Sequence, residues 1–219
     1  MAAVGERGLW LDTAHRADLA TFVERAVRLD DAAVIRLHVR SAGVFTAWVA
    51  TGFDVLASRV VAGTMRPDDM SVGADELARG LSAMDDDGYV DPGFPMDSAW
   101  RGALPPDSGF IQLDDVPARL MLDLSQRGAQ LAKDHGSAHG PPVSLLDQEV
   151  VRVSSSAVSV GVPMRCVFAL TAMGFLPQTP EAVDAEEIVR VRISPTWLRI
   201  DARFGSVYRR RGDPALVLR

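Results

Sequence analysis

The stretch EEIVRVRISPTWLRIDARFGSVYRRR, residues 186–211, carries the pattern that decides the fold. In its first part, β-branched residues alternate with Arg190 and Arg192. Alternation with a period of two indicates a β-strand with one buried and one solvated face. The part WLRIDARF, residues 197–204, alternates in the same way, and Gly205 then marks a turn into SVYRRR. This region therefore predicts an antiparallel meander.

The polar side of the predicted meander carries basic residues around one aromatic side chain. The five residues are Arg190, Arg192, Trp197, Arg199 and Arg203. Arginines interleaved with an aromatic residue can bind a protein, an anionic partner or single-stranded nucleic acid. A merely solvated sheet face would show the same pattern, and Asp201 can pair with a cross-strand arginine. We take the five residues as the candidate interaction surface, opposite an apolar side that holds Leu198, Ile200, Ala202 and Phe204.

A related pattern occurs near the N-terminus. In AAVIRLHVRS, residues 32–41, Ile35, Leu37 and Val39 oppose Arg36, His38 and Arg40. Gly43 and Gly52 lead into two further predicted strands, which gives a second three-stranded meander. AAVIRLHVR and EEIVRVRIS share enough to suggest a degenerate internal repeat, although any half-buried strand looks alike. The chain is therefore either one α+β domain over residues 1–219 or two pseudo-repeated halves, about 9–105 and 106–219.

Three to four helices accompany the two meanders and complete an α+β fold with a mainly antiparallel sheet. A first helix begins at Asp12 or Thr13, ends near Arg28, and bears an apolar stripe of Leu19, Phe22, Val23 and Ala26. A short helix is expected over residues 74–84. A third is expected to begin at Asp114 or Asp115, with Pro117 in its first turn. Its predicted inner stripe is Leu120, Leu124, Gly128 and Leu131, where Gly128 allows a close neighbour.

The stretch GVPMRCVFALTAMGFLP, residues 161–177, supports two interpretations. Its rhythm resembles the second helix of a helix-turn-helix, which suggests a winged-helix-like DNA-binding regulator. However, only Arg165 and Thr171 are polar between residues 163 and 173. A recognition helix needs polar side chains that reach bases and phosphates, whereas a helix that is apolar nearly all round is buried. We expect a core or subunit-interface helix, with Phe168 packed on Leu124 and Gly128 and on the sheet through Leu198 and Ile200.

The charge is unevenly distributed. The chain of 219 residues has a net charge of −6, yet the region from residue 187 to the end has eight arginines against three acidic residues. Residues 67–97 hold nine acidic residues against one base, Arg79. Such opposite regions favour attraction within a protomer or between two copies. The overall acidity makes nucleic acid an unfavoured partner.

No motif predicts a catalytic residue, a cofactor or a metal. His135 and His139 have the spacing of two zinc ligands, but the glycines beside them argue against a helix. The acidic run 85–91 fails the calcium-loop template at its first and last positions. Cys166 lies among apolar residues, which predicts a buried, inert thiol. The lone cysteine and the lack of a signal or membrane-spanning segment favour a cytoplasmic setting.

These observations favour a non-catalytic protein-interaction module that forms homo-oligomers. The contact would use the arginine-bearing sheet face or the apolar helix, and the partner would be a protein or another anionic molecule rather than a membrane. The winged-helix regulator is the alternative. A small-molecule enzyme is a third hypothesis, because a site built from dispersed residues leaves no spacing pattern.

Overall fold

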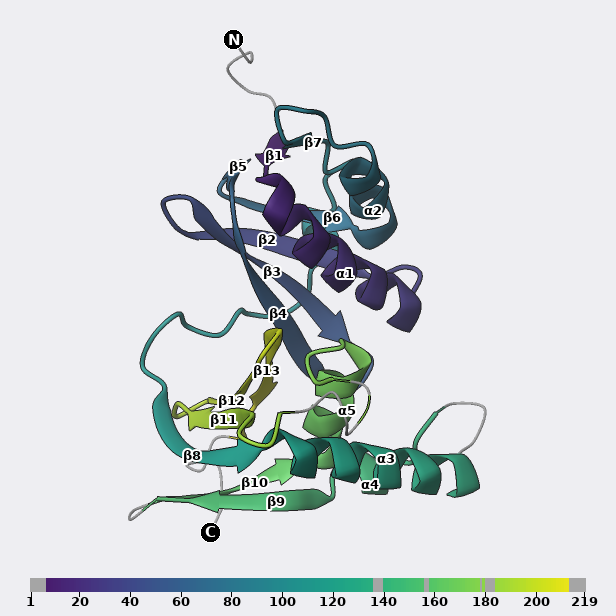
Figure 1. Ribbon diagram of the computed structural model, residues 1–219, viewed down its shortest axis with the longest axis vertical. Coiled ribbons are helices and arrows are strands. Elements are labelled where there is room, and N and C mark those ends of the chain that lie inside the picture. The colour runs from purple at the N-terminus through teal and green to yellow at the C-terminus, as the bar shows by residue number, and fades with distance from the viewer. Residues whose placement is uncertain (1–6, 136–139, 156–157, 178, 180–183, 213–219) are drawn as a thin grey trace. The chain divides into compact units, whose positions relative to one another are not determined.

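The computed structural model describes residues 7–135, 140–155, 158–177, 179 and 184–212 (Figure 1). The chain divides into two compact units. Unit 1 comprises Met1–Gly52 and Leu56–Leu104, and unit 2 comprises Phe53–Val55 and Pro105–Arg219. Both units combine helices with mainly antiparallel strands, which confirms the predicted α+β class. The internal repeat stays a prediction.

Among its described residues, unit 1 contains two groups of paired strands, two α-helices and a short 3-10 helix. Its elements are β1 (Gly8–Trp10), α1 (Thr13–Leu29), β2 (Val34–Ser41), β3 (Val44–Thr51), β4 (Val55–Ala62), β5 (Thr64–Arg66), β6 (Asp69–Gly73), α2 (Ala74–Ser82), β7 (Tyr89–Val90) and the short 3-10 helix η1 (Asp97–Ala99). The strands of the larger sheet follow the order β6-β2-β3-β4, and β5-β1-β7 form the smaller one. Helices α1 and α2 lie side by side (Figure 1).

The predicted N-terminal meander and first helix are both confirmed. β2 pairs antiparallel with β3, and β4 lies on the other side of β3. Ile35 and Leu37 are fully buried, whereas Arg36 on the opposite face is partly exposed. Helix α1 buries the predicted stripe and little else, which is the pattern of a surface helix. Strand β6, at the edge beside β2, has no counterpart in the sequence prediction.

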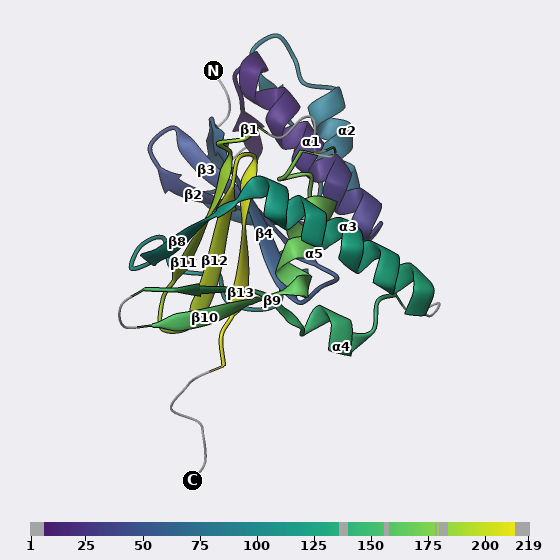
Figure 2. The ribbon, with the colours of Figure 1, turned by 60° about the horizontal axis from the view of Figure 1, so that its bottom comes forward.

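Unit 2 contains a four-stranded sheet, a separate two-stranded ribbon and three helices among the residues described. Its elements are β8 (Ile111–Pro117), α3 (Ala118–His135), α4 (Val143–Leu146), β9 (Glu149–Ser154), β10 (Ser159–Pro163), α5 (Met164–Ala172), β11 (Ile188–Ile193), β12 (Trp197–Ala202) and β13 (Gly205–Arg210). Strands β11, β12 and β13 form the predicted C-terminal meander, and β8 extends it at the edge (Figure 2). Strands β9 and β10 form the ribbon.

The prediction for the start of α3 was wrong. Asp114 and Asp115 do not cap a helix, because they lie within β8 and pair with Val191 and Arg190 of β11. The helix begins three residues later, after Pro117. Proline is tolerated there because a strand at the edge of a sheet has backbone positions that need no pairing.

The predicted inner stripe of α3 was also partly wrong. Leu120 and Leu131 are exposed. The buried face instead carries Ala118, Met121, Leu122, Ser125 and Gly128. The small residues of this face allow a neighbouring helix to approach closely. A Cβ atom at Gly128 would lie 2.8 Å from Sδ of Met164 and 3.0 Å from Cε1 of Phe168, so the predicted close approach at Gly128 is confirmed.

Helix α5 is the core helix predicted from its apolar composition. Every residue from Met164 to Leu170 is buried. The helix packs against α3, as expected, and against the following sheet on β13. Its one buried cation, Arg165, donates hydrogen bonds to the Asp147 carboxylate and to the Phe53 carbonyl at 2.7 Å, so burial leaves its charge compensated. A helix buried on all sides cannot enter a DNA groove, so the winged-helix interpretation was wrong.

Candidate interaction surface on the C-terminal sheet

The registers of the four strands in unit 2 place polar side chains on one face of the sheet. Arg190 lies opposite Asp201, and Arg192 lies opposite Arg199. On the outer side of β11, Arg190 also lies opposite Asp115 of β8. We refer to Arg190, Arg192 and Arg199, with the carboxylates of Asp115 and Asp201, as the arginine face. The opposite side of β11 holds the fully buried Val189 and Val191, as the alternation predicts.

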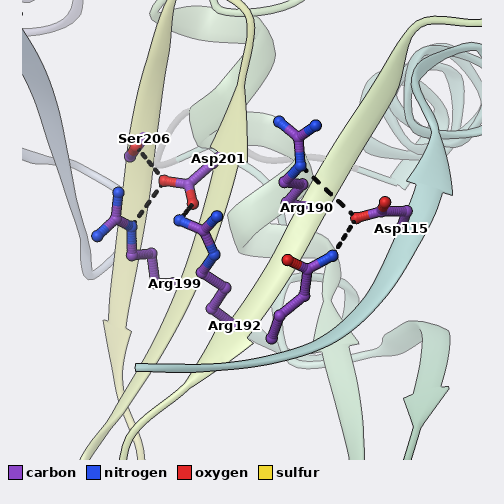
Figure 3. A network of polar contacts seen from close by, with 7 residues as sticks. Asp115, Arg190, Arg192, Arg199, Asp201 and Ser206 are labelled. Carbon is purple, nitrogen blue, oxygen red and sulfur yellow. Dashed lines mark hydrogen bonds and ion pairs between the residues drawn. The ribbon is translucent and has the colours of Figure 1, made fainter. Parts of the chain in front are cut away.

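Asp201 is the centre of the arginine face (Figure 3). Its carboxylate accepts hydrogen bonds from Nη1 of Arg192 and from Nε of Arg199, each at 2.7 Å, and from the Ser206 hydroxyl. Its side chain is only 15% exposed. One carboxylate therefore bonds two guanidinium groups and balances the charge of one of them, in a position that is largely shielded from water, where such charge-assisted bonds are strong.

Arg199 is a structural member of this network. Its guanidinium carbon lies 5.5 Å from the centroid of the Phe110 ring and 5.4 Å from that of Tyr208. The two rings also contact each other edge to face. Since the side chain is only 17% exposed and is bound to Asp201, it has little surface left for a partner.

Arg190 is the accessible member. Its side chain is 50% exposed, and its Nε lies 3.9 Å from the Asp115 carboxylate, at the limit of an ion pair. Asp115 also accepts a hydrogen bond from Gln112 at 2.8 Å (Figure 3). An exposed pair of this kind contributes little to stability, so Arg190 can exchange Asp115 for another acidic group at small cost.

The other two residues of the predicted surface do not join this network. Trp197 is only 7% exposed, with the Arg210 guanidinium 5.9 Å from its ring, so it offers no open stacking surface. Arg203 lies in the turn between β12 and β13, 3.8 Å from the Glu187 carboxylate. The alternation fails there because Ala202 already pairs with Gly205, which closes the hairpin. Phe204 lies in the same turn and is exposed, not on the apolar side.

The sequence interpretation missed the residues that complete the arginine face. Phe110, Gln112, Asp115, Ser206 and Tyr208 all contact its arginines or carboxylates. The signal for β8 was present in the alternation of Ile111 and Leu113 with polar residues, but Asp114-Asp115 before a proline matched a helix start more closely.

The sequence features considered for chemistry have structural roles where the structure describes them. Burial raises the pKa of the Cys166 thiol to about 12, which makes it a poor nucleophile. Asp85 accepts the backbone N–H of Tyr89 at 2.7 Å and so closes a turn rather than facing an ion. His139 lies outside the described residues. Among those described, no three His, Cys, Asp or Glu side chains are grouped to hold a metal, and no helix is long and apolar enough to span a membrane.

Comparison with solved structures identifies the fold. The chain resembles the C. crescentus beta sliding clamp, with a TM-score of 0.57 and 12% identity, over 97% of this chain and 68% of that one. It resembles the beta subunits of DNA polymerase from Streptococcus pyogenes and Pseudomonas aeruginosa with the same TM-score and identity, over 98% of this chain and 68% of each. The chain spans about two thirds of the length of the solved clamps it matches. At such low identity the resemblance concerns the fold alone.

Sequence comparison places the chain among families without an assigned function. No curated protein matches it. Residues 4–102 match the model of a domain of unknown function, DUF8010. Residues 105–214 match a second domain of unknown function, DUF8185. Since this second match covers half of the chain, the protein belongs to the DUF8185 family.

Proposed function

We propose that this protein is a non-catalytic interaction module that associates with further copies of itself through the edge of the sheet in unit 2. The observation that carries the proposal is the resemblance of nearly the whole chain to solved sliding clamps, which are subunits of a larger polymerase according to their descriptions. The charged groups of the arginine face support it, since they bond to one another and do not converge on a reaction centre.

Strand β8 supplies a suitable contact. It ends the strand order of the sheet, and among the described residues its hydrogen-bonded neighbour is β11. An edge strand presents backbone N–H and C=O groups that can pair with a strand of another chain. Ile111 on this strand is 68% exposed. Asp115 lies on the same strand, opposite Arg190 of β11, and a second copy can engage both charges as they exchange partners.

The molar mass in solution tests the proposal. Light scattering over a range of concentrations should give a mass above the 23.6 kDa of the single chain. A lysine on an edge strand opposes pairing with another strand, so Ile111→Lys should weaken association by about tenfold or more.

Val143→Lys is the matched control, because Val143 lies on α4 in the same unit and is 67% exposed. This substitution adds the same charge as Ile111→Lys. It should associate like the unmodified protein. A single-chain mass at every concentration would contradict self-association. If both substitutions weakened self-association equally, the contact between copies would not be at β8.

Duplex DNA should bind only weakly. Two carboxylates offset most of the charge of the three arginines on the arginine face, and the net charge of the chain is −6. Electrostatic affinity for DNA depends on uncompensated cations. Fluorescence anisotropy at ~0.15 M salt should give a dissociation constant weaker than about 1 μM. Nanomolar, sequence-specific binding would overturn this expectation.

A further inference from the structure

Unit 1 contains a pocket that no sequence feature predicted. Its volume is about 350 Å³, and it is lined by Arg36, Asp69, Ser71, Asp97, Trp100 and Gly102. We refer to it as the Trp100 pocket. A volume of this order is at the lower end of the range for small-ligand sites and can hold one large side chain. It lies on the polar face of the sheet in unit 1 and is separate from the arginine face.

Three segments hold the pocket in shape. Arg36 on β2 lies opposite Ser71 on β6. The Asp97 carboxylate accepts the backbone N–H of Ser71 at 2.6 Å, which fixes η1 against β6. The Trp100 indole N–H donates to the Gly102 carbonyl at 3.1 Å, so the ring is held by its own loop. These bonds position the carboxylate and the ring before any ligand arrives.

The lining carries more carboxylates than guanidinium groups, so its net charge is negative. Arg36 donates from Nε and Nη2 to the two carboxylate oxygens of Asp69, at 2.8 and 2.6 Å, so these two charges cancel. Asp97 is within ion-pair distance of no basic side chain among the described residues, and one of its oxygens has no bonded partner there. Arg7 donates to the backbone carbonyls of Ser71 and Gly93 and does not line the pocket.

We propose that the Trp100 pocket binds the side chain of an arginine from a basic peptide segment of a partner protein. A guanidinium stacks on an indole face and donates to a carboxylate at the same time, which suits Trp100 and Asp97. The surrounding segment 67–97 has nine acidic residues against one base, so its field attracts cations and repels phosphates. The proposal does not depend on self-association.

The test is an NMR titration with N-acetyl-L-arginine amide as the probe. The readout is the chemical shift of the indole N–H signal of Trp100. The signal is assigned by its loss in Trp100→Phe. The shift should saturate with millimolar probe. The citrulline analogue has the same shape without the charge, so it should bind about tenfold more weakly.

Asp97→Asn should reduce affinity for the arginine probe about three- to tenfold, since the amide oxygen can still accept the Ser71 N–H but the charge is gone. Asp31→Asn is the control, because Asp31 is an exposed aspartate of the same unit that does not line the pocket. It should leave the affinity unchanged. The unfolding midpoint of each variant shows whether the fold is retained.

Three results would overturn the proposal. The first is equal binding of the arginine and citrulline probes. The second is an equal loss of affinity for the arginine probe in Asp97→Asn and Asp31→Asn, which would show that only the net charge of the protein matters. The third is a saturable Trp100 shift with inorganic phosphate, which would make Arg36 the binding group and an anion the ligand.

Discussion

The two units place arginines on a sheet face by the same alternating pattern, yet the surroundings of those arginines differ. In unit 1, Arg36 has a carboxylate of its own, Asp69, and the pocket beside the pair stays open. In unit 2, Arg192 and Arg199 share Asp201, and aromatic rings cover one of them. The pattern of a strand thus fixes which face is polar. Residues from other segments decide whether that face becomes a pocket or a closed network.

The helices of the two units also differ in how far other segments cover them. Helix α1 buries one stripe and exposes the rest, whereas every residue of α5 from Met164 to Leu170 is buried, and the helix packs against α3 and β13. A short helix is unstable alone, so α5 is stabilised by its packing against neighbouring elements. Unit 2 should therefore be the more sensitive of the two to changes in helix packing.

The largest expected effect is at Phe168. Its ring lies against α3 at Gly128 and 6.0 Å from the ring of Phe53. Phe168→Ala should lower the free energy of unfolding by about 3–5 kcal/mol, the range for a deleted buried aromatic side chain. Chemical denaturation at several protein concentrations measures this and separates any contribution from association.

Two controls accompany it. Thr171→Ala, which loses a hydrogen bond to the Ser125 hydroxyl, should cost about 1 kcal/mol. Phe94→Ala in unit 1 should cost almost nothing, because that ring is exposed. An unchanged midpoint for Phe168→Ala would mean that α5 is not the core of unit 2.

Glycines inside helices give the second comparison. A Cβ at Gly80 of α2 would lie within van der Waals overlap of the Asp91 carbonyl oxygen, which is backbone and cannot easily move. At Gly128 the obstacle is the flexible end of Met164. Gly80→Ala should therefore cost about 3 kcal/mol and Gly128→Ala about 1 kcal/mol, after the gain in helix propensity. The reverse order in denaturation experiments would show that α5 has less freedom to adjust than the loop after α2.

The sequence predicted those features that depend on local periodicity. The meanders and α1 follow from spacing alone, because burial of one face imposes that spacing directly. The buried α5 follows instead from its apolar composition. Strands β6 and β8 were missed since both are edge strands that contain aspartate, and aspartate is depleted in strands. The stripe of α3 was misplaced because its contact surface uses Ser125 and Gly128, which hydrophobicity does not mark.

The candidate site was predicted only in part, for a related reason. Alternation identified Arg190, Arg192 and Arg199, but it cannot tell whether a side chain on the polar face is open or covered. Trp197 is covered and Arg203 lies in a turn. The Trp100 pocket depends on η1 folding back onto β6, a contact between segments that no spacing in the sequence encodes.

The shared carboxylate gives a third prediction, smaller than the packing effects. Asp201→Asn leaves Arg192 and Arg199 without a negative partner at a largely shielded position, so it should cost about 2 kcal/mol. Asp115→Asn is the control on the same face, and its exposed, distant pair with Arg190 should contribute less than about 0.5 kcal/mol. If both substitutions had equal effects in denaturation, the arginine face would be a set of separate surface pairs rather than a network.

The smallest effect concerns the Arg36–Asp69 pair of unit 1, whose carboxylate also lies 3.5 Å from Nδ1 of His38, and its dependence on pH. Hydrogen bonds from Arg36 hold the pKa of Asp69 below its ordinary value of 3.8. A carboxyl with a lowered pKa in the folded state stabilises that state fully above the pKa of the unfolded chain, about 3.9. This contribution is lost as the pH falls through the folded-state pKa. Because Asp69 is more than a third exposed, the pair should contribute less than about 1 kcal/mol.

Asp69→Asn tests this pH dependence when it is unfolded beside the unmodified protein from pH 7 to pH 3. The difference in unfolding free energy should be constant above about pH 5 and should shrink below about pH 4, where the unmodified carboxyl gains its proton. Asp31→Asn, which removes an exposed carboxylate elsewhere in unit 1, should show a smaller and flatter difference. A difference for Asp69→Asn that grew towards low pH would mean that Arg36 does not stabilise the charged form of Asp69. Asp69 would then not act as a stabilising partner of Arg36, in contrast to the way Asp201 acts for Arg192 and Arg199 in unit 2.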